Sequence, residues 1–439
     1  MSQPLDKFLQ QLSETRLFRL TGRVTKVVGM TIESIGPRAM VGDVCRIVSE
    51  LGTECLAEVV GFRDERLVLM PLGEIRAVAP GADVIVSGSS LVVPSGMQLL
   101  GRVLNGLGQV MDDGPSLDDQ EGEAKLETSS PHPLQRLMID KPFITGIRAI
   151  DSLLTVGRGQ RMGIFAGSGV GKSTLLSMIA RHAEADVSVI ALIGERGREV
   201  REFLEHDLGS QGLSRSVVVV ATSDQPALVR LKAAHVATAI AESFRDEGLH
   251  VNLMLDSITR FAMALREVGL AAGEPPTSRG YTPSVFAALP KLLERAGAGH
   301  RGTITAFYTV LVDGDDLNDP ISDAVRGILD GHVVLSRKIA HSGHFPAIDV
   351  LASISRLFPT LASSEQLEAT RVLRGWLQRY RDVEDLVRIG AYQPGSDPDA
   401  DMAIRKMPEI LKFLRQDKEE KEDYSTTMRR LAELVGVTT

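Results

Sequence analysis

Residues 161–174 read Arg-Met-Gly-Ile-Phe-Ala-Gly-Ser-Gly-Val-Gly-Lys-Ser-Thr, and this stretch decides the fold. A short apolar run leads into a glycine-rich turn, and the residues that follow, 175–180, have the pattern of a helix. Gly167, Gly169 and Gly171 let successive backbone N–H groups point at one spot, and the helix adds the positive end of its dipole there. The stretch is therefore predicted to be a phosphate-binding loop between a strand and a helix.

The loop predicts that the chain binds a nucleoside triphosphate such as ATP together with Mg²⁺. Lys172 would place its ammonium against the β- and γ-phosphates, and Ser173 would put its hydroxyl on Mg²⁺. One position departs from the pattern G-x-x-x-x-G-K-[ST], because its first glycine is Ala166, a substitution that some phosphate-binding loops accept. The residues expected to hold the nucleotide are Ala166, Gly167, Ser168, Gly169, Val170, Gly171, Lys172, Ser173 and Thr174.

Length and composition limit the class of protein. The 439 residues leave room for two or three domains, and 43 % hydrophobic residues suffice for real cores. A net charge of −8 and the lack of a long basic stripe argue against nucleic acid as the main partner. Cys45 and Cys55 have no metal-site spacing, which favours a reducing cytosol. The longest apolar stretches, such as 304–312, are too short for a membrane span, so at most peripheral membrane association is expected.

Three long stretches of the sequence differ in their pattern of apolar residues. In residues 18–90, alternating apolar residues broken by regular turn signals predict a small all-β barrel. In residues 91–362, apolar strand-like runs alternate with helical segments, which predicts an α/β nucleotide-binding core with a mostly parallel sheet covered on both faces. Residues 363–439 return to helical periodicity and predict a C-terminal helical domain. The fold class is therefore α/β, with a β-barrel before the core and helices after it.

The first residues have a pattern of their own. In residues 1–17, Leu5, Phe8, Leu9 and Leu12 recur at helical spacing and predict a short amphipathic helix. Such a stripe packs against the core or docks a partner, and the sequence leaves both alternatives open.

Two further segments offer carboxylates for the chemistry. Asp256 ends the apolar run that starts at Val251, where it could hold the Mg²⁺ shell directly or through water. Glu195 follows the preceding predicted strand, where a carboxylate could position and polarise the attacking water. Its neighbour Arg196 could contact the γ-phosphate oxygens. A solvated charge cluster at the end of a strand is the alternative interpretation of Glu195 and Arg196.

Several motifs together resemble one family. They are the phosphate-binding loop, Gly-Glu-Arg-Gly-Arg-Glu at 194–199, Leu-Asp-Ser-Ile-Thr-Arg at 255–260, Gly-Glu-Pro-Pro at 273–276, and Pro-Ala-Ile-Asp-Val-Leu-Ala-Ser-Ile-Ser at 346–355. The last matches the signature P-[SAP]-[LIV]-[DNH]-x₃-S-x-S of the rotary ATPase α/β subunit superfamily. The resemblance covers essentially the whole chain, in the order barrel, core and helical domain. Within the superfamily, the phosphate-binding loop, residues 222–228 and residues 280–286 look most like the flagellar export ATPases, whose close relatives are the type III secretion ATPases of injectisomes.

The resemblance implies a RecA-like P-loop core that hydrolyses ATP with Mg²⁺, and it implies roles for individual residues. Lys172 and Ser173 would be ligands of phosphate and Mg²⁺, Glu195 the catalytic carboxylate, Asp256 a residue of the outer Mg²⁺ shell, Arg196 and Arg260 neighbours of the γ-phosphate, Phe345 the aromatic on which adenine stacks, and Arg356 an arginine finger. The superfamily's non-catalytic subunits carry Gln at the position of Glu195, so a catalytic subunit is favoured.

The resemblance also implies partners, namely further copies of the chain in a homo-hexameric ring with ATP at the subunit interfaces. It adds a stalk-like central protein, a peripheral regulator, the membrane export gate, and export substrates with their chaperones, all at the cytoplasmic face of the membrane.

Three alternatives remain beside flagellar export. An RNA-driven hexameric motor would need aromatic and basic stacking platforms near its N-terminus, whereas the first 90 residues hold only Phe8, Phe18 and Phe62 as aromatics and no basic cluster. A non-catalytic scaffold subunit is disfavoured by Glu195 and Arg356. An injectisome ATPase would use the same chemistry on a different cargo, and the sequence does not exclude it.

Overall fold

The computed structural model describes residues 21–49, 52–75, 78–87, 91–117, 122–312, 314, 316 and 318–436. The helix predicted over residues 1–17, with Leu5, Phe8, Leu9 and Leu12, lies outside the described residues. The chain divides into two compact units. The first runs to Leu91 and includes the short segments Pro226–Val229 and Glu267–Pro275, and the second contains the remainder.

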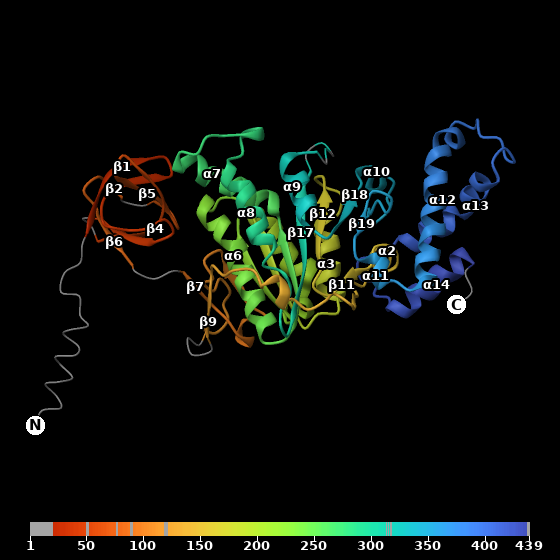
Figure 1. The fold of residues 1–439 in the computed structure, drawn as a ribbon, viewed down its shortest axis with the longest axis horizontal. Coiled ribbons are helices and arrows are strands. Elements are labelled where there is room, and N and C mark those ends of the chain that lie inside the picture. Colours follow the sequence, from red (N-terminus) through yellow and green to blue (C-terminus); the bar gives the residue numbers. More distant parts are fainter. Residues whose placement is uncertain are drawn as a thin grey trace, which may run out of the picture. The chain divides into compact units, whose positions relative to one another are not determined.

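The first unit contains a closed antiparallel barrel in the order β1-β2-β5-β4-β3-β6, drawn in red and orange in Figure 1. Its strands are β1 (Gly22–Val28), β2 (Thr31–Ile35), β3 (Val44–Val48), β4 (Glu54–Arg63), β5 (Arg66–Pro71) and β6 (Asp83–Val86). Alternate side chains such as Val24, Ile32 and Val84 fill the interior, as the period of two requires.

The second unit is built on a sheet in the order β19-β18-β12-β17-β15-β13-β14-β8, with β16 paired to β17. Its strands are β8 (Val103–Asn105), β12 (Arg161–Ala166), β13 (Val187–Ile193), β14 (Ser216–Ala221), β15 (His250–Asp256), β16 (Gly297–Ala298), β17 (Thr303–Leu311), β18 (Gly331–Leu335) and β19 (Ile354–Ser355). All pairs are parallel except β16 with β17 and β18 with β19. The strands β13 and β14 are buried along their whole length, as expected of parallel strands covered on both faces.

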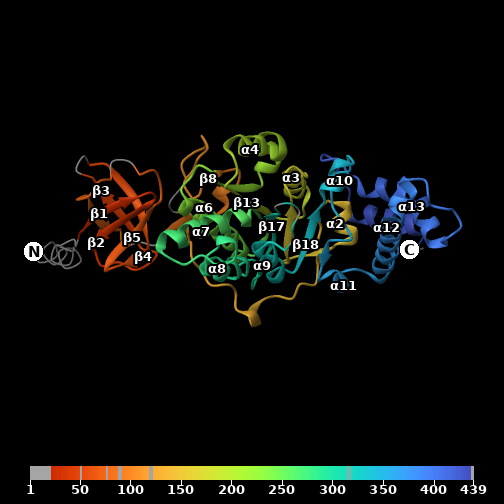
Figure 2. The ribbon, with the colours of Figure 1, turned by 90° about the horizontal axis from the view of Figure 1, so that it is seen from above.

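Helices cover this sheet, with α3 and α4 on one face and α8 and α9 on the other (Figure 2). The helical segments of the core are α2 (Arg148–Leu153), α3 (Lys172–His182), α4 (Gly197–Glu202), η3 (Phe203–Leu208), α5 (Gly209–Leu213), α6 (Ala227–Asp246), α7 (Ile258–Ala272), η4 (Ser278–Gly280), α8 (Pro283–Leu293), α9 (Pro320–Ile328), α10 (Arg337–His341) and α11 (Phe358–Leu361). Short strands and turns precede the sheet or flank it, namely β7 (Val92–Pro94), η1 (Met97–Leu99), β9 (Glu123–Lys125), η2 (Pro133–Gln135), β10 (Pro142–Phe143) and β11 (Val156–Gly157).

The last helices, α12 (Ser364–Arg388), α13 (Pro398–Leu414) and α14 (Tyr424–Val435), belong to the same compact unit as the sheet. Leu373, Phe413 and Leu431 of these helices share one buried cluster with Phe143 and Ile147 of the core. Ser363, Asp397 and Asp423 begin the three helices by accepting hydrogen bonds from first-turn N–H groups. The predicted fold class is thus confirmed. Among the helices that the structure describes, none is long and apolar enough to cross a membrane.

Candidate nucleotide site

The glycine-rich stretch forms a loop at the carboxyl edge of the core sheet. It leaves β12 after Ala166 and enters α3 at Lys172, and β12 lies between β17 and β18 inside the sheet. Gly169 and Gly171 have φ angles of 76° and 89°, in the left-handed region that glycine adopts without strain. A glycine-rich loop that enters a helix in this way can direct successive N–H groups at one phosphate group.

Lys172 lies between two carboxylates from neighbouring strands. Its Nζ is 2.5 Å from Oδ1 of Asp256 at the end of β15 and 3.3 Å from Oε1 of Glu195 just beyond β13. Asp256 is buried, and its Oδ1 also accepts a hydrogen bond of 2.7 Å from Oγ1 of Thr309 on β17. The structure therefore brings together three residues that the sequence analysis took from three separate motifs.

Burial and these neighbours change the ionisation of the group. Burial raises the pKa of Glu195, and the negative charge of Asp256 adds to this rise, while Lys172 acts against it. Burial by itself would lower the pKa of Lys172, but Asp256 and Glu195 outweigh it and hold that pKa above its usual value. The lysine therefore stays charged, and Glu195 is a stronger base than an exposed glutamate.

The two predicted arginines beside Glu195 differ in their surroundings. The side chain of Arg260 lies against the backbone of Gly194, where an added Cβ atom would be 3.0 Å from its Cβ and Cγ. Its Nε is buried and has no hydrogen-bond partner among the described residues, whereas its Nη1 contacts the sulfur of Met263 at 3.9 Å. Arg196 is 78 % exposed, and its Nη1 lies 3.8 Å from Oε1 of Glu199, so it is not drawn into the group around Lys172.

Phe345 lies beside the phosphate-binding loop although 173 residues separate it from Lys172 in the sequence. A Cβ atom added at Gly171 would lie 3.4 Å from Cδ1 of the Phe345 ring. The phenylalanine is 44 % exposed, so part of its ring remains open to stack on a planar group.

Arg356 lies at the other edge of the sheet. It follows Ser355, which pairs with Gly331 at the start of β18, and Gly331 is level with Met162 near the start of β12. The phosphate-binding loop begins only after Ala166, roughly 13 Å farther along β12 at the rise of a parallel strand. Arg356 is exposed and lines a hollow of about 400 Å³ together with Arg326, His332 and Ile354. The chain's own Arg356 is therefore not brought to its own loop.

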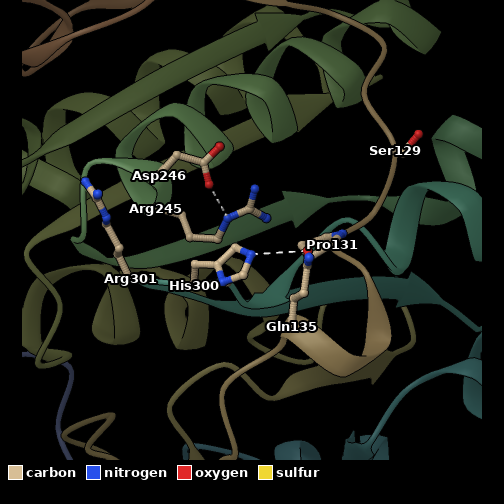
Figure 3. Close-up of a pocket in the computed structure, with 8 residues that line it drawn as sticks. Ser129, Pro131, Gln135, Arg245, Asp246, His300 and Arg301 are labelled. Atoms are coloured by element: carbon tan, nitrogen blue, oxygen red, sulfur yellow. Dashed lines mark hydrogen bonds and ion pairs between the residues drawn. The ribbon is translucent and has the colours of Figure 1, made fainter.

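A second hollow lies near this amino edge, at the end of α6 and before β17 (Figure 3). Its volume is about 310 Å³, and Arg245, His300 and Arg301 line it with Asp246. Nε of Arg245 donates a hydrogen bond of 2.8 Å to Asp246. None of the predicted site residues lines this hollow, so it is separate from the nucleotide site.

Thr309, which donates a hydrogen bond to Asp256, could not be singled out from the sequence. The only signal was a hydroxyl within the apolar run of β17, and that run also contains Thr303 and Thr305, so the pattern did not single it out.

The donors at the loop fit Mg²⁺. The hydroxyl of Ser173 is exposed in the first turn of α3, and Asp256 offers a carboxylate, both being the oxygen ligands that Mg²⁺ prefers. No cluster of three or more His, Cys, Asp or Glu that could hold a metal occurs among the described residues. Mg²⁺ is commonly bound by one or two protein groups together with phosphates and water.

Comparison with known proteins places this geometry in a family. Residues 146–355 match the nucleotide-binding domain of the ATP synthase alpha/beta family, and residues 362–433 match the C-terminal domain of the T3SS ATPase EscN. A flagellum-specific ATP synthase from Bacillus subtilis is 54 % identical, and the alignment covers 96 % of this chain and 97 % of that protein. The chain belongs to the ATP synthase alpha/beta family.

Other relatives refine its place among these ATPases. A type 3 secretion system ATPase from Xanthomonas euvesicatoria is 51 % identical, with 96 % of each chain covered. The structure of the assembled ATPase EscN of enteropathogenic E. coli superposes with a TM-score of 0.90 at 47 % identity, covering 94 % of this chain and all of that one. The predicted resemblance to flagellar and type III secretion ATPases is thus confirmed.

Proposed function

We propose that the chain hydrolyses ATP to drive the export of flagellar proteins through a type III secretion apparatus. The observation that carries this proposal is the group of Lys172, Glu195 and Asp256 at the phosphate-binding loop. The group combines a cation that would bind phosphate with one carboxylate that would hold Mg²⁺ and another that would position the attacking water. The identity of 54 % to a flagellum-specific ATP synthase along nearly the whole chain supports the choice of process.

The ground-state contacts would come from the loop and from Phe345. The loop amides and Lys172 bind the phosphates, and the ring of Phe345 stacks on the adenine. Ser173 and Asp256 would hold Mg²⁺, directly or through water. When bound, Mg²⁺ neutralises the charge that develops on the phosphate oxygens during transfer.

The transition state would depend on Glu195 and the arginines. When Lys172 binds phosphate oxygens, it no longer hydrogen-bonds to Glu195. The carboxylate of Glu195 is then free to accept a hydrogen bond from the attacking water and to hold it in line with the γ-phosphate. Arg260, with its unpartnered Nε, would contact the γ-phosphate oxygens, and Arg196 would have to turn from Glu199 to do the same.

Arg356 would act on the nucleotide of a neighbouring chain. Its place at the amino edge of the sheet, away from its own loop, supports a head-to-tail ring in which this edge faces the loop of the next copy. We propose a homo-hexamer with ATP at each interface, and the assembled EscN structure of a relative at 47 % identity supports an oligomer.

Further partners follow from the same proposal. EscN has also been solved in complex with its central stalk EscO, which supports a stalk-like partner for this chain. A peripheral regulator, the membrane export gate, and export substrates with their chaperones would complete the apparatus at the cytoplasmic face of the membrane.

The main experiment deletes the gene in its own organism and restores it with either the wild-type or the Glu195→Ala coding sequence. We expect loss of motility and of flagellar filaments, restored only by the wild type. Loss of effector secretion with intact swimming would instead assign the chain to an injectisome, which the 51 % identity to a type 3 secretion system ATPase keeps as the second candidate.

A further inference from the structure

Gln416, just beyond α13, connects three segments that are far apart in the sequence. Its backbone N–H donates a hydrogen bond of 3.0 Å to the carbonyl of Phe345. Its side-chain Oε1 accepts one of 2.9 Å from the backbone N–H of Arg148, and its Nε2 donates to the carbonyls of Gly146 at 2.8 Å and Glu420 at 2.9 Å. The residue is 3 % exposed, and its amide uses the acceptor and both donors.

The chain on both sides of Gln416 is held by Arg148, which is also 3 % exposed. The guanidinium donates hydrogen bonds to the carbonyls of Phe413 at 2.9 Å and of Arg415 at 2.6 Å. It also pairs with Glu420 and with Glu422, the latter at 3.1 Å. The backbone around residue 416 is thereby fixed to the start of α2.

The segments that Gln416 joins border both ends of α3. Phe345 lies against Gly171, directly before the first residue of that helix. Gly146 lies against its last residue, because a Cβ atom added at Gly146 would be only 2.5 Å from Cβ of His182. A displacement of Gln416 would therefore change the position of Phe345 relative to the loop that holds the phosphates.

We propose that Gln416 is a positioning residue that holds the ring of Phe345 where it stacks on the base of the nucleotide. This inference rests on the proposed adenine contact of Phe345. The backbone bond to Phe345 depends on where the side-chain amide anchors residue 416, so changing that amide alters the base contact without touching the nucleotide. The last residues of α13 and the turn after it are then part of the nucleotide site.

The first test separates binding of the base from binding of the phosphates in the full-length protein. Gln416→Met keeps the length of the side chain but removes its three hydrogen bonds. We expect the KM for ATP to rise by about 3- to 10-fold, a fraction of what a lost base–aromatic stack removes, while kcat stays within about twofold. The Kd for inorganic tripolyphosphate, which has no base, should stay unchanged. Gln393→Ala, at an exposed glutamine of the same helical region, is the matched control and should change neither constant.

The second test asks whether Gln416 acts through Phe345. Phe345→Ala should weaken ATP binding more than Gln416→Met does, and adding Gln416→Met to Phe345→Ala should weaken it no further. Gln416→Glu is a second probe if the Met variant does not fold. It keeps the acceptor for Arg148 but faces the carbonyls of Gly146 and Glu420 with a carboxylate, and the same selective rise in KM is expected.

Four results would overturn the inference. Equal losses of ATP and tripolyphosphate binding would show a general loosening of the site, and additive effects in the double variant would show a route that bypasses Phe345. An unchanged affinity for ATP in Gln416→Met, while Phe345→Ala weakens it, would reject the positioning role and leave the adenine contact intact. An unchanged affinity in Phe345→Ala would reject the adenine contact itself.

Discussion

The two edges of the core sheet differ in what they offer a nucleotide. At the carboxyl edge, Lys172 hydrogen-bonds to both Glu195 and Asp256, and Phe345 lies beside the loop. At the amino edge, Arg356 is exposed and lines a hollow together with Asp323 and Arg326. One edge thus carries nearly all groups of the proposed site, and the other carries Arg356. The difference favours a site completed by two chains, and each of the first three predictions below tests one edge.

The largest effect is expected at the amino edge. Arg356→Ala should leave ATP binding intact and lower the rate of hydrolysis by about 10³- to 10⁵-fold, as arginine fingers do in other phosphoryl transfers. Mixing Arg356→Ala chains with Glu195→Ala chains should restore part of the activity, because some interfaces of a mixed ring then contain both an intact Glu195 and an intact Arg356. ATPase assays across mixing ratios measure this. A mixture that stays inactive although mixed rings form would contradict the interface site.

The next effect lies at the carboxyl edge. Glu195→Ala should leave nucleotide binding and assembly intact and lower kcat by at least about 10²-fold, since it removes the carboxylate that positions the water. Burial raises the pKa of Glu195. As the pH decreases, the wild-type rate should therefore begin to fall at a higher pH than it would with an exposed glutamate. Steady-state kinetics and nucleotide titration separate the two constants. Near-normal turnover of the variant would reject the role of Glu195.

A smaller effect is expected for the ground-state contact. Lys172→Ala should weaken ATP binding by about 10- to 100-fold, the scale of one charged hydrogen bond, and it leaves Glu195 and Asp256 facing the phosphates without a counter-ion. Isothermal titration with ATP measures the loss. Lys412→Ala, at an exposed lysine of α13, serves as the control and should bind normally. An unchanged affinity in Lys172→Ala would contradict a phosphate-binding role of the loop.

The smallest effect concerns His235, which lies in the middle of α6. Burial, with help from Arg295 and Lys232, lowers the pKa of His235 to about 3, and its Nδ1 lies 3.3 Å from Nη1 of Arg295, which pairs with Glu242. Below pH 6.5 the unfolded chain binds a proton here that the folded chain does not. This histidine therefore lowers the free energy of unfolding by up to about 1.4 kcal/mol per pH unit as the pH falls.

Urea unfolding of the wild type and of His235→Gln between pH 7 and 5 measures the contribution of His235. As the pH falls, the free energy of unfolding of the wild type should decrease more than that of the variant. A constant difference across this range would contradict a buried neutral His235.

Local sequence patterns predicted the parts of the site that depend on a single strand and the turn after it. Gly167 to Ser173 and Asp256 follow apolar runs, so their place at one edge of a parallel sheet could be inferred from strand order alone. Thr309 and Gln416 could not be inferred in this way. Gln416 reaches Arg148 across 268 residues, and no periodicity or motif records which side chain will meet which backbone after the helical region packs on the core. Phe345 came only from the resemblance to a family.

The strand β12 has one more consequence, because it connects the phosphate-binding loop with the residues beside Arg356. Arg161 at its start holds the carboxylate of Asp330 with Nε and Nη2, both at 3.0 Å, and the carbonyl of the same aspartate accepts a hydrogen bond of 3.0 Å from the backbone N–H of Arg356. The other end of β12 continues into the phosphate-binding loop. In a head-to-tail ring, this short strand would connect the nucleotide that a chain binds with the arginine that it contributes to the neighbouring site. Binding or release of the nucleotide at one interface would then affect the next interface of the ring, through a strand of six residues.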